Sequence, residues 1–173
     1  NNSDAEFCIA DVHPVVGLEI REEELPVPSL YSWEKASPDQ ESKIIFVDDQ
    51  QIKMVGDSSA NGYQLMSKPI DVPKKSELVL DAPLIMDRGS AGVGILDSKG
   101  LWLVPPQIGK NTLTFSPNEN NQITIVIANT MTEKQVSTSF TLQKPRLIIK
   151  FDGETLYADK MVDKYYEVLD RFR

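Results

Sequence analysis

An aromatic side chain beside two amides is the most compact set of residues in this sequence that could bind a ligand. Tyr63 lies two residues after Asn61 and directly before Gln64. A sugar ring has apolar C–H faces and polar edges, so a sugar site needs a flat aromatic ring beside groups that hydrogen-bond hydroxyls. We therefore predict Tyr63, Asn61 and Gln64 as a candidate ligand-binding set, with Trp33 and Trp102 as further aromatic candidates. Both tryptophans would also fill a hydrophobic core well.

The orientation of Trp102 depends on the turn from Asp97 to Gly100. A four-residue loop would place Trp102 opposite Ile95, facing the core. A three-residue loop would place it beside Leu96, on the other face of the sheet. Both registers remain open at this point, so Trp102 is a candidate for the core and for the site.

Catalytic and metal-binding chemistry has few candidate residues. His13 and Cys8 are the only histidine and the only cysteine, too few for a soft-metal site, and no nucleophile-elbow motif surrounds a serine. Asp48, Asp49 and Asp57 could supply oxygen ligands to a structural calcium ion, although solvated turn carboxylates explain them more simply. We expect a noncatalytic protein without a cofactor other than such a calcium ion. A glycan hydrolase is the least favoured alternative.

The composition restricts the possible partners and the location. The 173 residues carry a formal net charge of -8 at pH 7, which disfavours nucleic acid. No apolar run approaches the roughly 18 residues that a membrane-spanning helix needs. The sequence begins at Asn1 rather than Met, which suggests a processed chain or a segment of a longer polypeptide. The compartment stays open, with an extracytoplasmic one, secreted or periplasmic, favoured.

A period of two in the side-chain pattern predicts a mainly β protein. Residues spaced two apart form one face of each predicted strand: Ile52 and Met54, Leu78 and Leu80, Ile123, Ile125 and Ile127, and Val136, Thr138, Phe140 and Leu142. Gly, Pro, Asn and Asp interrupt these segments at short intervals. Short strands with this spacing are typical of an antiparallel β-sandwich, here of about ten strands. The glycines in the stretch that starts at Gly89 are expected to permit close backbone approach or a facing aromatic ring.

The C-terminal segment has a different period. From 158 to 172, Met161, Tyr165, Val168 and Phe172 recur at steps of four, three and four, which predicts an amphipathic helix. We therefore predict a β-sandwich domain over 1–144. An appendage over 145–173 would consist of a hairpin and this helix, packed on the sandwich or on a partner.

Two sequence segments resemble those of a known fold family. They are "GYQLMSKPIDVPKKSELVLDAPL" and "GSAGVGILDSKGLWLV". Together they resemble galactose-binding-like β-sandwiches, particularly the jelly rolls of carbohydrate-binding modules, over roughly residues 30 to 143. Where such modules commonly carry a glycine, this chain has Pro73, Lys74 and Lys75. The match is carried by Tyr63, Leu65, Ser67, Pro69, Ile70 and Val72, and then by Val93, Gly94, Ile95, Leu96, Asp97, Gly100 and Trp102.

The resemblance implies a jelly-roll-like sandwich and, as the leading function, a noncatalytic carbohydrate-binding or accessory module. Such a module would belong to a larger bacterial protein that acts on glycans or the cell envelope, and its partner would be a glycan or polysaccharide. Many members of the superfamily have lost sugar binding, so fold alone does not fix the function. The alternative is a protein-interaction or assembly domain that uses the C-terminal helix.

Overall fold

The computed structural model describes residues 21–130 and 136–151. These residues form antiparallel strands and one 3-10 turn, η1 (Leu30–Ser32), and they contain no α-helix. The mainly β prediction is therefore confirmed. The predicted helix over 158–172 lies outside the described residues, as do His13 and Cys8. No helix within the described ranges is long and apolar enough to cross a membrane.

The described strands are short and follow one another closely along the chain. In chain order they are β1 (Arg21–Leu25), β2 (Glu34–Lys35), β3 (Lys43–Phe46), β4 (Gln51–Val55), β5 (Tyr63–Met66), β6 (Ile70–Asp71), β7 (Glu77–Asp81), β8 (Leu84–Arg88), β9 (Ala91–Asp97), β10 (Trp102–Ile108), β11 (Thr112–Phe115), β12 (Gln122–Asn129), β13 (Ser139–Gln143) and β14 (Arg146–Phe151).

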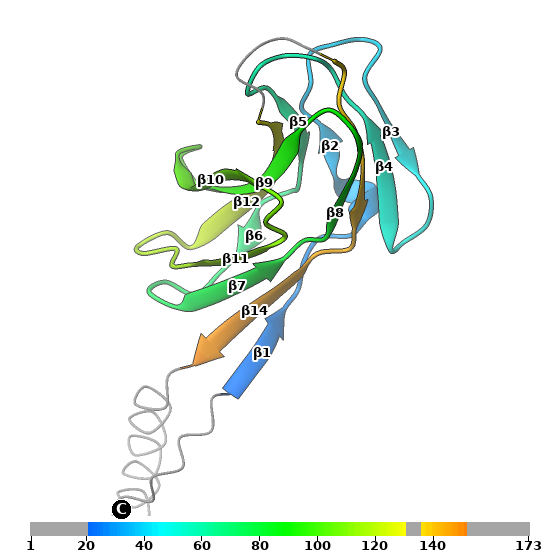
Figure 1. Cartoon of the computed structure of the whole chain (residues 1–173). Helices are drawn as coiled ribbons and strands as arrows, with labels where there is room; N and C mark the ends of the chain where they lie inside the picture. The colour runs from blue at the N-terminus through cyan, green and yellow to red at the C-terminus, as the bar shows by residue number, and fades with distance from the viewer. Residues whose placement is uncertain (1–20, 131–135, 152–173) are drawn as a thin grey trace, which may run out of the picture. The chain divides into compact units, whose positions relative to one another are not determined.

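The strands form three antiparallel sheets. One has the order β10-β9-β12-β5-β2, with β6 also paired to β12, and the others have the orders β1-β14-β7-β11 and β3-β4-β13-β8. Pro83 separates β7 from β8, and Pro145 separates β13 from β14. Because proline has no backbone N–H to donate, each proline interrupts a strand and lets the chain pass from one of these sheets into the next. Figure 1 shows the resulting sandwich.

One hydrophobic core joins the three sheets. It takes alternate residues from β12 (Ile123, Ile125 and Ile127), from β7 and β14, and from β4 and β13, where Phe140 is the largest fully buried side chain. The predicted isoleucine face of β12 is therefore confirmed. Fully burying each such aliphatic side chain contributes roughly 1.5–3 kcal/mol, which is the main force that holds the layers together.

Strand β14 occupies an inner position in its sheet. It pairs with β1 on one side and with β7 on the other, with Ile149 opposite Leu78 and Leu147 opposite Leu80 (Figure 1). All four of these side chains are buried in the core. Residues 146–151, which are predicted above as part of an appendage, thus contribute to the sandwich. The remainder of that appendage lies outside the described residues.

Candidate functional site

Two aromatic rings meet on the outer face of the β10-β9-β12-β5-β2 sheet. Trp102 starts β10 and Tyr63 starts β5, and their ring centroids are 5.3 Å apart at an interplanar angle of 75°. Trp102 is 37% exposed and Tyr63 is half-buried. Edge-to-face contact is a favoured geometry for aromatic rings. We call these two residues the aromatic pair.

The turn before Trp102 decides that its ring lies outside the core. Trp102 is opposite Leu96, and the backbone N–H of Asp97 donates to the carbonyl oxygen of Leu101 at 2.8 Å. The loop therefore has three residues, with Gly100 at φ +78° in the left-handed region that this loop type requires. Of the two registers left open by the sequence, the structure has the one that places Trp102 beside Leu96.

A glycine leaves room for the indole ring against the sheet. A Cβ atom on Gly94 would lie 2.7 Å from Cζ3 of Trp102, and one on Gly92 would lie 2.6 Å from the carbonyl oxygen of Gln107. Both glycines thus have the predicted role, one beneath an aromatic ring and one at a close approach of the backbone. Gly94 allows the indole of Trp102 to lie directly on β9.

A second, smaller apolar cluster packs against Tyr63 of the aromatic pair. Leu96, Val126 and Ala128 are buried on the outer face of the sheet, and Tyr63 and Met66 pack against them. Sequence reasoning missed this cluster. Its signal is the uninterrupted apolar run from Ile125 to Ala128, because a strand covered on both faces loses its alternation.

A β-bulge turns Tyr63 to the outer face. Along β5, Leu65 is opposite Ile127 and Tyr63 is opposite Ala128, so Gln64 is one extra residue without an opposite partner. Strict alternation would put Tyr63 and Leu65 on the same face. The bulge separates them, and Leu65 is fully buried in the core while Tyr63 reaches the aromatic pair.

Gln64 is fully buried and is held by Asp57, so it cannot reach a ligand beside Tyr63 as predicted. Its Nε2 donates to Oδ1 of Asp57 at 2.8 Å and to the carbonyl oxygen of Gly62 at 3.1 Å, and its Oε1 accepts from the backbone N–H of Asp57 at 2.8 Å. The amide's hydrogen-bonding capacity is thus used within the fold. The bulge explains the difference, because it directs Gln64 inward.

Asp57 is a buried carboxylate at the centre of a polar network. Besides Gln64, its oxygens accept hydrogen bonds from the hydroxyl of Ser37 at 2.7 Å, from the backbone N–H and hydroxyl of Ser59, and from Nδ2 of Asn129 at 3.2 Å. Burial raises the pKa of Asp57, but the hydrogen bonds from Ser37, Ser59 and Gln64 outweigh it and lower the pKa from 3.8 to about 2. The network therefore holds an ionised carboxylate with neutral donors.

The three calcium candidates do not come together. Asp48 accepts hydrogen bonds from the backbone N–H groups of Gln50 and Gln51 at 2.8 and 2.9 Å, so it caps the β3–β4 turn, and Asp49 is exposed in the same turn. Asp57 follows the opposite end of β4. Within residues 21–130 and 136–151, no group of three His, Cys, Asp or Glu could hold a metal ion. Asp48 thus acts as a turn residue and Asp57 as a network residue, because backbone and hydroxyl groups donate to their carboxylates.

Trp33 belongs to the core. It is 2% exposed and packs in the main hydrophobic cluster. Its Nε1 is buried with no hydrogen-bond partner among the described residues. Of the predicted aromatic candidates, Trp33 thus fills the sandwich, while Tyr63 and Trp102 come together on its surface.

Polar groups border the aromatic pair on the same face. Glu34 is opposite Met66 and forms an ion pair with Lys68, and Nε2 of Gln122 donates to Oδ1 of Asp71 at 2.9 Å. Asn61 is exposed in the turn that leads into Tyr63. The face thus combines an exposed ring with amide, carboxylate and ammonium groups. Of these polar residues, the sequence had predicted only Asn61.

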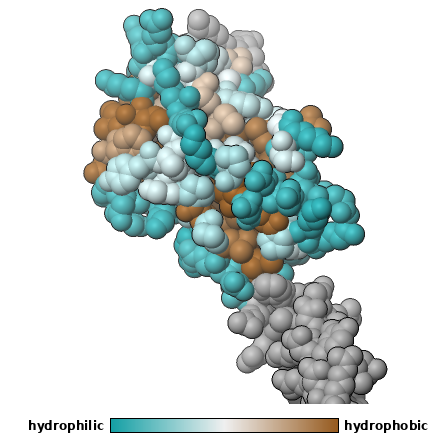
Figure 2. Space-filling view, turned by 180° about the vertical axis from the view of Figure 1, so that it is seen from behind, coloured by the Kyte–Doolittle hydropathy of each residue, from teal (hydrophilic) through white to brown (hydrophobic). Residues whose placement is uncertain are grey.

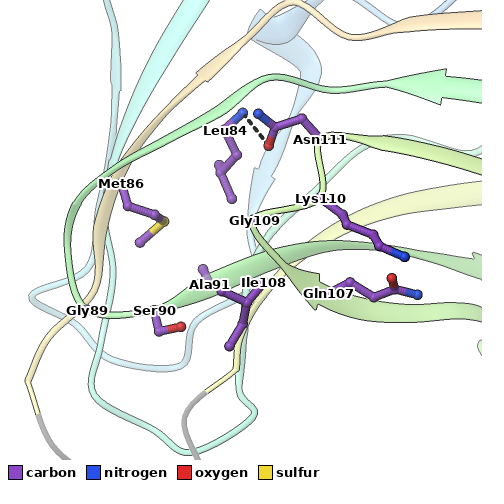
Figure 3. A pocket seen from close by; sticks show the side chains of 10 residues that line it. All are labelled: Leu84, Met86, Gly89, Ser90, Ala91, Gln107, Ile108, Gly109, Lys110 and Asn111. Atoms are coloured by element: carbon purple, nitrogen blue, oxygen red, sulfur yellow. Dashed lines mark hydrogen bonds between the residues drawn. The ribbon is translucent and has the colours of Figure 1, made fainter.

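A separate hollow of about 180 Å³ lies between β8 and the β10–β11 turn (Figure 3). The side chains of Leu84 and Met86 point into it, whereas those of Gln107 and Lys110 point away. Oδ1 of Asn111 accepts the backbone N–H of Leu84 at its rim, at 3.3 Å. No set of polar side chains converges on this hollow, so it lacks the combination found at the aromatic pair.

No known protein-family model matches the chain, and no curated protein matches it. Solved structures that are similar to it include the Glycosylation Associate Protein (Gap123) complex from Streptococcus agalactiae, with 11% sequence identity and a TM-score of 0.48. That similarity covers 76% of this chain and 26% of that one, so this chain spans only a minor part of the streptococcal structure.

Two further structures are similar over most of their own length. Accessory secretory protein 1, 2 and 3 in Streptococcus pneumoniae has 10% identity and a TM-score of 0.41, with 69% of this chain and 98% of that chain covered. The CBM22-1 xylan-binding domain from Paenibacillus barcinonensis Xyn10C has 9% identity and a TM-score of 0.46, with 76% and 94% covered. The class that the chain's own structure defines is a mainly β, antiparallel sandwich.

Proposed function

We propose that this chain is a noncatalytic, jelly-roll-like glycan-binding module whose ligand lies on the outer face of β9, β12 and β5. The observation that carries the proposal is the exposed indole of Trp102, which lies over Gly94 and against the ring of Tyr63. A ring fixed in this way presents a flat apolar surface without the entropic cost of ordering it on binding. Such a surface fits the C–H face of a sugar.

The polar border of the pair favours an uncharged ligand. Lys68 is already paired with Glu34, and Asp71 carries a second carboxylate on the same face. With one cation and two anions there, the surface offers no excess positive charge to an acidic sugar. The formal net charge of -8 also disfavours acidic sugars, and it does so at longer range. We therefore expect neutral glycans to be preferred over acidic ones.

Binding to such a surface is expected to be weak. One exposed ring and a few hydrogen bonds that compete with water leave only a small net free energy of binding, because association itself costs free energy. We expect dissociation constants on the order of 0.1 to 1 mM. A multivalent polysaccharide is the appropriate first probe, because repeated sites raise the apparent affinity.

Affinity electrophoresis and calorimetric titration with neutral and acidic polysaccharides test the proposal. Trp102→Ala should abolish or weaken binding at least tenfold. Ile85→Ala, which removes a 51% exposed side chain from β8 of another sheet, should leave it unchanged. Melting curves of both variants control for folding. Absence of binding by the wild-type chain, or equal binding by Trp102→Ala, would refute the proposal.

The alternative of an assembly domain that uses the C-terminal helix concerns residues outside the described ranges and stays a prediction. We also propose an extracytoplasmic location, in keeping with a glycan ligand. Fractionation of cells of the native host, with this chain followed through the fractions, tests that location.

A further inference from the structure

The turn that leads from β4 into β5 contains the only Asn-Gly pair in the sequence, Asn61–Gly62. Asn61 is exposed and has φ +53°, in the left-handed region, and the backbone N–H of Gly62 closes the turn on the carbonyl oxygen of Ser59. Figure 2 shows a mainly hydrophilic surface at the end of the sandwich where Figure 1 shows the chain passing from β4 into β5. Water therefore reaches this turn.

The fold requires a glycine after Asn61. A Cβ atom on Gly62 would collide with Oγ of Ser59, and that hydroxyl is held in place because it donates to Oδ1 of Asp57. Glycine permits a close approach to its backbone, since it has no side chain to shield the nitrogen. A backbone nitrogen that another group can approach thus follows directly after an exposed side-chain amide.

Neither of these two groups is held by a strong hydrogen bond. The N–H of Gly62 lies 3.4 Å from the carbonyl oxygen of Ser59, longer than the usual range of about 2.7–3.2 Å. The side-chain amide of Asn61 forms no hydrogen bond with another described residue, whereas the buried amides of Gln64 and Asn129 both donate to Asp57. The amide of Asn61 can therefore turn its Cγ toward the nitrogen of Gly62.

We propose that Asn61–Gly62 is a site of spontaneous deamidation in the folded protein. The nitrogen of Gly62 loses its proton and bonds to Cγ of Asn61, and the side-chain nitrogen of Asn61 leaves with that proton as ammonia. Water then opens the resulting succinimide ring. Cleavage between Cγ and the Gly62 nitrogen gives aspartate, and cleavage between the main-chain carbonyl carbon and that nitrogen gives isoaspartate. The reaction consumes water and releases ammonia, with no oxidant or reductant.

Isoaspartate changes the main chain at the point where Tyr63 is positioned. Its main chain passes through Cβ and Cγ, so it is one atom longer, and the former main-chain carbonyl becomes a carboxylate. The next residue, Gly62, accepts the backbone N–H of Asn129 at 2.8 Å and Nε2 of Gln64 at 3.1 Å. These bonds hold the start of β5 beside the bulge that turns Tyr63 toward Trp102. The longer main chain therefore displaces Tyr63 from the aromatic pair.

Mass spectrometry of the full chain after incubation in neutral and mildly alkaline buffer tests the modification. The tryptic peptide 54–74 contains one asparagine, Asn61, and should gain the mass that accompanies replacement of NH2 by OH. The rate should rise with pH, because the attacking nitrogen must lose its proton. Asn118 is the internal control, since it is also exposed with φ +53° but is followed by Glu119, whose side chain shields the backbone nitrogen. Asn61 should react at least tenfold faster than Asn118.

The same measurement on the chain unfolded in guanidinium chloride shows whether the fold leaves the site reactive. The folded chain should modify Asn61 at a rate within tenfold of the unfolded chain. A folded chain that reacts more slowly than this, or that modifies Asn61 less than tenfold faster than Asn118, would overturn the proposal, because the turn would then hold the two reacting groups apart.

Variants separate the added charge from the longer main chain. The purified isoaspartate form should lose the near-ultraviolet circular dichroism of the aromatic pair, whereas freshly prepared Asn61→Asp, which adds the charge alone, should retain it. Asn61→Gly has no amide and suits φ +53°, so it should keep its own initial spectrum during incubation. The matched variant Asn118→Gly should lose its spectrum at the wild-type rate.

Polysaccharide titration of the fresh and isoaspartate forms measures the effect on the ligand surface. This effect rests on the proposed function, whereas the deamidation itself does not. The isoaspartate form should bind at least tenfold more weakly than the fresh chain. If no sample binds polysaccharide although peptide 54–74 is modified, the proposed function fails and the deamidation site stands. Equal spectra and equal binding of the two forms would overturn the inferred displacement of Tyr63.

Discussion

The side chain of Gln64 pairs with Asp57 through two hydrogen bonds of 2.8 Å, one to the carboxylate and one from the backbone N–H. Gln64 is also the extra residue of the β5 bulge that turns Tyr63 toward Trp102. A fully buried amide thus positions an aromatic ring that lies on the opposite side of the sheet. The arrangement of the outer face thus depends on a polar network inside the fold.

Gln64→Leu should disturb the aromatic pair as well as stability. The substitution leaves the buried Asp57 without one donor, and each such unsatisfied group costs about 1–3 kcal/mol. We expect a loss of roughly 2–4 kcal/mol in the free energy of unfolding, measured by urea titration, if the lost bonds to Asp57 and Gly62 act together. The near-ultraviolet circular dichroism of Trp102 and Tyr63 should change too.

Gln122→Leu is the matched control for that variant. Gln122 is exposed and makes one hydrogen bond to Asp71. Its loss should cost less than about 0.5 kcal/mol, as for most surface substitutions. An unchanged aromatic spectrum in Gln64→Leu would show that the bulge forms without this amide.

Asp57 should make stability dependent on pH in the acid range. Its pKa is lowered from 3.8 to about 2 in the folded state. The carboxylate therefore stabilises the fold fully above pH 3.8, and this contribution is lost as the pH falls toward 2. The shift corresponds to roughly 2 kcal/mol. Urea titrations between pH 6 and 2 measure it, and the Asp57→Asn variant should show a shallower fall over the same window.

Gly94→Ala should displace the indole of Trp102. The added Cβ would lie 2.7 Å from the ring and 3.0 Å from the backbone oxygen of Val104, so the strand or the ring must move. Overpacking of this kind typically costs about 1–3 kcal/mol. Tryptophan fluorescence and melting temperature should both change, and polysaccharide binding should weaken.

Gly100→Ala is the control for Gly94→Ala, because it replaces a glycine without displacing the indole of Trp102. Its Cβ would meet nothing within 4 Å, but the residue has φ +78°. It should lose about 1 kcal/mol of stability through backbone strain alone. The fluorescence of Trp102 should be retained. Equal spectral changes in the two variants would contradict the contact between Gly94 and the ring.

Tyr63 and Trp102 should be energetically coupled. An edge-to-face pair is worth about 0.5–1.5 kcal/mol beyond the burial of its area. In a double-mutant cycle, the losses caused by Tyr63→Ala and Trp102→Ala should therefore add to more than the loss in the double variant. A coupling energy near zero in urea titrations would mean that the two rings do not support each other in solution.

Several features of the fold follow from the sequence alone. The alternation of Ile123, Ile125 and Ile127 predicts a core-facing strand, and the structure buries all three. The glycines after Gly89 predict close approach, which Gly92 and Gly94 show. These are local properties, because the side chains of a strand alternate whatever its neighbours are, and a missing Cβ always leaves space.

The candidate site was decided by contacts between distant segments. The sequence allows two registers for Trp102, and pairing with Leu96 selects the outer face. It offers Gln64 as a neighbour of Tyr63, but the bulge against β12 and the bonds to Asp57 turn that amide inward. A single inserted residue changes the face of the side chains that follow, and its position is fixed only when two strands pair. Sequence by itself thus determined which residues form strands, and the tertiary structure determined which aromatic rings reach the surface.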